Sequence, residues 1–125
     1  MPDASESDAT IREFTEAASR LGRYLAASDG DRPEVEFLLR RIEVAYAVLV
    51  EQGAQSKIGS LLAHEDPYVR LYAAQVLLLT EEAQAVQALE SLQRMPMPPN
   101  LAANARLFLT HWKMGVLFPG SWPRP

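Results

Sequence analysis

Apolar residues recur every three or four positions along most of the chain, which is the spacing of one face of an α-helix. No stretch alternates apolar and polar residues as a half-buried strand would. The pattern predicts an all-α fold of about six helices, stacked as antiparallel helical hairpins. The expected helices cover residues 10–27, 33–53, 54–63, 67–79, 80–95 and 101–114.

Turn-forming residues separate these helices. Asp66 suits the N-cap of the fourth helix, and Pro67 suits its first position because the proline ring already fixes a helical φ angle. Gly53 is expected to end the second helix. Thr80, followed by two glutamates, predicts a capped start for the fifth helix.

The two ends of the chain differ from its middle. Residues 1–9 are polar and turn-prone, which predicts a disordered lead-in, with Thr10 as the cap of the first helix. One helical domain is expected over residues 10–115. Residues 116–125 hold three prolines but keep several apolar side chains, so we expect an extended tail that packs on the domain.

Residues 61–78 read LLAHEDPYVRLYAAQVLL. This segment contains a leucine pair, an Asp-Pro break, a Val-Arg pair and an alanine pair, followed by aliphatic residues. That order of residues resembles the HEAT-repeat signature. The small alanines would let neighbouring helices approach closely, and Arg70 is expected to reach acidic groups or carbonyls in a turn between repeats. The residues assigned to the repeat are Asp66, Pro67, Val69, Arg70, Ala73 and Ala74.

The resemblance extends over residues 21–119. This part of the chain is similar to a small bacterial family of HEAT-like proteins without an established general function. The similarity lies in the segment VRLYAAQVLLL, the alanine-rich helix after it and the segment NARLFLTHWKMGVLFP. The resemblance implies a HEAT-like short α-solenoid. Members of that family occur beside polymorphic toxins, so it also implies an immunity or antitoxin role. Residues 1–33 show little of this pattern.

The composition limits the kinds of active site and partner that we expect for this chain. A chain of 125 residues with 48% apolar residues suits one soluble domain. The lack of cysteine excludes disulfides, thiolate metal sites and cysteine nucleophiles. The net charge is -4, and four dispersed basic residues in 83–125 form no stripe for duplex binding. An acidic protein is better suited to a basic protein partner.

The candidate chemical groups are few. His64 and His111 are the only imidazoles, and neither has the spacing of a metal-binding motif. His64 lies beside two acids, and we interpret that cluster as a capping turn in preference to a metal site. No phosphate-binding loop or nucleophile elbow occurs. We therefore expect no catalysis, no metal and no cofactor.

One surface is a candidate for partner binding. Tyr68, Tyr72, Gln75 and Leu79 follow one another at helical spacing, on a stripe separate from the core stripe of the same helix. Tyrosines on such a stripe suit a protein interface, although packing against neighbouring helices explains them equally well. Further candidates for this surface are Glu36, Arg40, Glu43, Asn104 and His111.

These observations favour a non-enzymatic interaction protein that binds and blocks a cognate bacterial toxin with a basic surface. The alternatives are a scaffold or regulatory subunit of a larger assembly and, less favoured, a HEAT-like nucleic-acid-binding protein. No segment reads as a signal peptide or as an apolar stretch of the roughly 20 residues that cross a bilayer. We expect a cytoplasmic protein, with the periplasm as the alternative.

Overall fold

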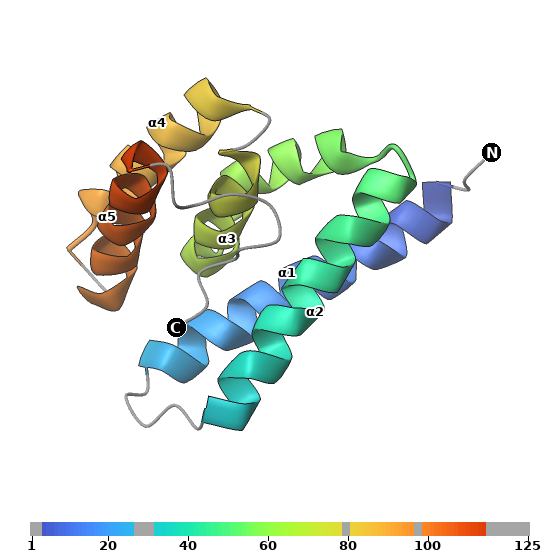
Figure 1. Ribbon diagram of the computed structural model, residues 1–125, viewed down its shortest axis with the longest axis horizontal. Coiled ribbons are helices and arrows are strands. Elements are labelled where there is room, and N and C mark those ends of the chain that lie inside the picture. The colour runs from blue at the N-terminus through green and yellow to red at the C-terminus, as the bar shows by residue number, and fades with distance from the viewer. Residues whose placement is uncertain (1–3, 27–31, 79–80, 97–98, 115–125) are drawn as a thin grey trace. The chain divides into compact units, whose positions relative to one another are not determined.

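The computed structural model describes residues 4–26, 32–78, 81–96 and 99–114. These residues form five α-helices, one 3-10 helix and no β-strand, which confirms the all-helical prediction (Figure 1). In chain order the elements are α1 (Ala4–Ala26), α2 (Arg32–Glu51), the 3-10 helix η1 (Gln55–Ala63), α3 (Pro67–Leu77), α4 (Glu82–Gln93) and α5 (Pro99–Lys113). The tail expected over residues 116–125 lies outside the described residues.

The chain groups into two compact units, unit 1 (Met1–Leu61) and unit 2 (Leu62–Pro125). Unit 1 contains α1 and α2, and unit 2 contains α3, α4 and α5. The single domain over residues 10–115 and the α-solenoid stay predictions.

Unit 1 is built on a hairpin in which α1 and α2 run antiparallel, side by side (Figure 1). The side chains between the two helices are large and fully buried, among them Phe14 and Leu21 of α1 and Leu38, Ile42 and Leu49 of α2. Burial of each such side chain stabilises the fold by about 1.5–3 kcal/mol relative to leaving it in water. The apolar spacing of each segment predicted its helix, and the structure shows that the two helices share one core.

The first helix begins at Ala4, and this corrects the expectation of a disordered lead-in and of a cap at Thr10. Lys57 of η1 accounts for part of the difference, because its Nζ donates to Ser7 Oγ at 2.6 Å and contacts Asp8 Oδ1 at 3.2 Å. Ser7 is buried. A lysine about 50 positions away in the chain therefore helps to hold this mostly polar segment in the helix.

Unit 2 is centred on α3. Every residue of α3 from Tyr68 to Leu77 is buried except Arg70, as expected for a helix that is apolar almost all round. Helices α4 and α5 pack against it and against each other. Their buried side chains include Ala85, Leu89 and Leu92 of α4 and Leu101, Ala105 and Phe108 of α5.

The helix ends follow local chemistry. Asp66 caps α3 as predicted, because its Oδ1 accepts a hydrogen bond of 2.9 Å from the Tyr68 backbone N–H. Gly53 lies just after α2 with a φ angle of +67°, a left-handed conformation that suits glycine. The start of α4 differs from the prediction, since its N-cap is Glu81, which makes no side-chain cap hydrogen bond.

Candidate protein-binding surface

A hollow of about 430 Å³ opens on unit 1 between α1 and α2, and we call it the α1–α2 hollow. It is lined by Ala9, Thr10, Glu13, Phe37, Arg40, Arg41, Val44, Ala45 and Val48. Most of these residues are apolar, and the three charged side chains are Glu13, Arg40 and Arg41. A hollow of this composition suits an apolar side chain of a partner, and its charged groups suit polar groups that surround that side chain.

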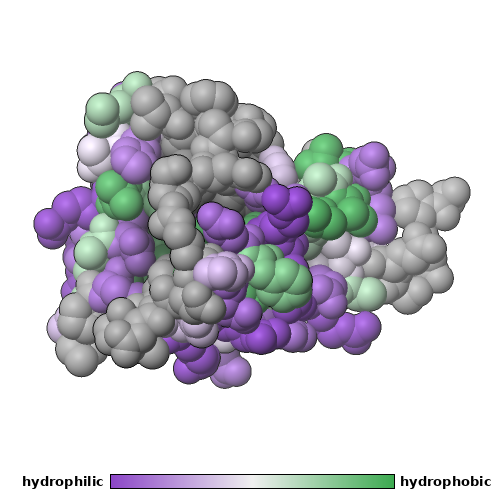
Figure 2. Space-filling view, turned by 60° about the horizontal axis from the view of Figure 1, so that its bottom comes forward, coloured by the Kyte–Doolittle hydropathy of each residue, from purple (hydrophilic) through white to green (hydrophobic). Residues whose placement is uncertain are grey.

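Two of the lining side chains are large, apolar and exposed. Phe37 is 54% exposed and Val44 is 55% exposed, and both lie on α2. A separation of seven residues, about two helical turns, places them on the same side of the helix. On the face drawn in Figure 2, apolar side chains reach the surface as small patches separated by hydrophilic ones. An exposed aromatic residue beside an apolar hollow is a feature of protein-binding surfaces.

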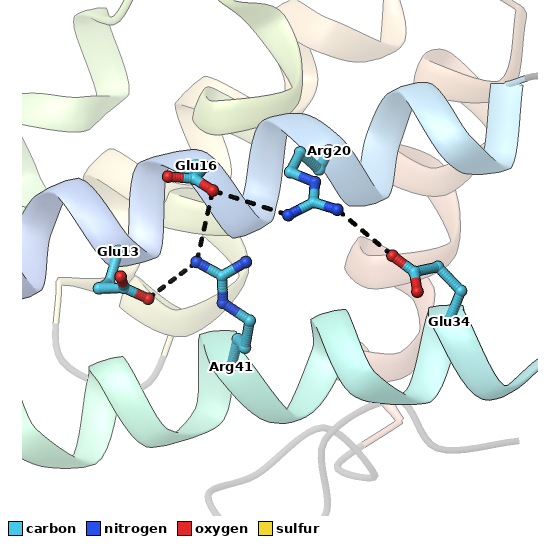
Figure 3. A network of polar contacts seen from close by, with 5 residues as sticks. All are labelled: Glu13, Glu16, Arg20, Glu34 and Arg41. Carbon is cyan, nitrogen blue, oxygen red and sulfur yellow. Dashed lines mark hydrogen bonds and ion pairs between the residues drawn. The ribbon is translucent and has the colours of Figure 1, made fainter.

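Ion pairs join α1 to α2 next to the hollow (Figure 3). The Arg41 guanidinium lies 2.8 Å from a Glu13 carboxylate oxygen and 3.6 Å from one of Glu16. Arg20 continues the network to Glu16 at 3.6 Å and to Glu34 at 3.5 Å. The hydrogen bond to Glu13 raises the pKa of Arg41.

This network positions Arg41 in the wall of the hollow. The Phe37 ring lies against the same guanidinium, with 5.9 Å between Arg41 Cζ and the ring centroid. Arg41 therefore contacts α1 through its carboxylate partners and orients an exposed aromatic ring on its own helix. This contact favours one orientation of the exposed ring on the surface of α2.

The net charge of the chain comes from unit 1. Residues 1–61 contain eleven acidic and seven basic residues, a net charge of -4, whereas residues 62–125 contain five of each. Glu13 and Glu16 remain about 60% exposed despite their ion pairs. The lining of the α1–α2 hollow holds two arginines and one glutamate, whereas the unit around it has a net negative charge, which favours a partner that carries basic side chains.

No family model, curated protein or solved structure matches this chain. The resemblance to HEAT-like proteins stays a prediction.

The structure buries most of the tyrosine stripe. Tyr68, Tyr72 and Gln75 are each at most 6% exposed. The Tyr68 hydroxyl donates to Asn100 Oδ1 at 3.1 Å, so it joins α3 to α5. Burial raises the pKa of Tyr72. These side chains pack inside the protein, which is the alternative that the sequence left open, while Leu79 lies outside the described residues.

The other candidate residues fall into two groups. Glu36 and Arg40 are exposed on α2 and Glu43 is half-buried there, but only Arg40 lines the α1–α2 hollow. Asn104 and His111 are half-buried and lie seven residues apart on α5 of unit 2. A surface shared by these α2 and α5 residues stays a prediction.

Sequence reasoning missed Phe37 and Val44. The buried stripe of α2 passes through Leu38, Ile42 and Leu49, and both missed residues lie off that stripe. Two large apolar residues seven positions apart, outside the core stripe, are the signal that would have found them.

Two further observations concern chemistry and membranes. Within the described ranges, no group of three or more His, Asp or Glu side chains is arranged to hold a metal ion. None of the helices in those ranges has both the length and the apolar character of a membrane span.

Proposed function

We propose that this chain is a non-enzymatic protein-binding module whose α1–α2 hollow receives an apolar side chain of a partner with a basic surface. The observation that carries the proposal is the exposed pair Phe37 and Val44 at the edge of the hollow. The net charge of -4 in residues 1–61 supports the basic character of the partner.

The partner that we propose is a bacterial toxin, which the chain would inhibit by covering its surface. This step rests on the resemblance of residues 21–119 to HEAT-like proteins found beside toxins, and on an acidic surface that suits a basic active site. Inhibition by occupation requires no catalytic group, in keeping with a sequence that has no cysteine and no nucleophile elbow.

Two matched variants test the binding surface. Val44→Ser removes an apolar group from the hollow, whereas Val50→Ser changes an exposed valine of the same helix that does not line it. The tagged chain is used to capture its partner from a bacterial host, and the affinity of each variant for that partner is measured by calorimetry. We expect Val44→Ser to weaken binding about tenfold or more and Val50→Ser to leave it nearly unchanged. Equal effects of the two changes would reject the hollow as the binding site.

The toxin assignment has a separate test. The captured partner is purified, and its toxicity on expression in cells and its activity in solution are measured with and without the chain. Stoichiometric inhibition supports an immunity role. A bound partner that keeps its activity and is not toxic supports the scaffold alternative, and salt-dependent retention of DNA by the chain would favour the nucleic-acid-binding alternative.

A further inference from the structure

A second hollow, of about 400 Å³, lies within unit 2 between the start of α3 and one face of α4. We call it the Arg70 hollow. It is lined by Leu62, Arg70, Gln84, Gln87, Ala88, Ser91, Leu92 and Met95. Its polar groups are one guanidinium, two primary amides and one hydroxyl, and none of these lining residues is acidic.

The Arg70 guanidinium has more N–H groups than its two contacts use. Its Nη1 donates to the His64 carbonyl oxygen at 2.7 Å, in the turn that precedes α3, whereas a turn between repeats stays a prediction. Its Nη2 is directed to the Met95 sulfur at 3.7 Å. A thioether is a weak acceptor, whereas a guanidinium offers five N–H groups. The carbonyl contact fixes the position of the side chain without neutralising its charge.

The residues on α4 complete a set of donors. Gln84, Gln87 and Ser91 follow one another at spacings of three and four residues, so they lie on the same side of α4. All three are exposed and their side chains can donate hydrogen bonds. A ligand with two acceptor oxygens and one negative charge would match the guanidinium bidentately and use these neutral donors for its remaining lone pairs.

We propose that the Arg70 hollow binds a carboxylate group. One guanidinium balances one negative charge, which favours a carboxylate over a doubly charged phosphate. Residues 62–125 have no net charge, so an anion meets no overall repulsion from this unit. The proposal is independent of the α1–α2 hollow, because it concerns the other unit and a ligand of opposite charge.

The test uses sodium acetate as the probe on the full chain at constant ionic strength. The amide resonances of Gln84 and Gln87 and the guanidinium resonances of Arg70 are followed by heteronuclear NMR. We expect a saturable shift confined to these groups. Arg70→Lys keeps the charge but loses bidentate geometry, so the acetate affinity should fall roughly tenfold. The matched control is Arg94→Lys, an exposed arginine outside the lining, which should bind acetate as the parent chain does.

A second arm distinguishes the sources of the carboxylate. A capped peptide with a single aspartate is compared with its asparagine counterpart, which lacks the carboxylate, and with acetate. Tighter binding of the aspartate peptide than of acetate identifies a protein carboxylate as the ligand. Equal or tighter binding of acetate identifies a free acid, and both results support the proposal. Should Arg70→Lys unfold, Gln87→Ala replaces an exposed side chain and should still weaken acetate binding. Unsaturable shifts, equal loss in Arg94→Lys, or tighter binding of inorganic phosphate would overturn the carboxylate assignment.

Discussion

The Tyr72 ring meets the Phe108 ring edge-on, with their centroids 6.0 Å apart and their planes at 60°. This contact joins α3 to α5 inside unit 2, and Tyr72 is only 3% exposed. Edge-to-face pairs of buried aromatic rings add about 0.5–1.5 kcal/mol to the stabilisation from burial. Tyr72 therefore belongs to the core of unit 2.

Replacement of Tyr72 by alanine should damage folding. We expect Tyr72→Ala to lower the free energy of unfolding by about 3 kcal/mol or more, because it removes a buried ring and leaves a cavity. Tyr72→Phe keeps the ring contact with Phe108 and should cost much less. Denaturant titration followed by circular dichroism measures both. A stable Tyr72→Ala chain that has lost only partner binding would restore the tyrosine stripe as an interface.

Alkaline pH should destabilise the protein through the same residue. Burial raises the pKa of Tyr72 in the folded chain, whereas an unfolded tyrosine ionises near pH 10. The stabilising contribution is thus fully present below about pH 10 and is lost as the pH rises, by up to about 1.4 kcal/mol per pH unit. Denaturation midpoints measured between neutral pH and pH 11 should fall more steeply for the parent chain than for Tyr72→Phe. Parallel curves would show that Tyr72 ionises normally in the folded state.

The ion pair between Arg41 and Glu13 should contribute little to stability. It joins two helices at 2.8 Å, but the Glu13 side chain is 60% exposed, so solvent screens the attraction. A double-mutant cycle with Arg41→Gln and Glu13→Gln should give a coupling free energy of about 0.2–1 kcal/mol that shrinks in high salt. A coupling that is larger, or that salt does not change, would contradict this prediction.

The cap of α3 can be tested locally. Asp66→Ala removes the acceptor of the Tyr68 backbone N–H and should lower the free energy of unfolding by about 1 kcal/mol. Asp66→Asn keeps an acceptor and should restore most of that loss. Thermal unfolding of the two variants against the parent chain provides the comparison. If both variants lost the same stability, the carboxylate charge and not the cap geometry would matter.

Local signals were sufficient for the helices and for several of their ends. Asp66 and Pro67 predicted the start of α3, and Gly53 predicted the end of α2, because each acts on the backbone within about two residues of its own position. The first turns of α1 could not be predicted in this way. They depend on Lys57, which reaches Ser7 and Asp8 from η1, and no local pattern reports a contact that distant.

The amino-acid sequence by itself determined the helical periodicity, the core stripe of each helix and the acidic character of residues 1–61. The tertiary structure decided which residues outside those stripes reach the surface. Spacing sets the angle between side chains on a helix but does not reveal how many neighbours surround it. Helix α3 packs against both α4 and α5, so Tyr72 is buried, whereas α2 packs mainly against α1 and leaves Phe37 exposed.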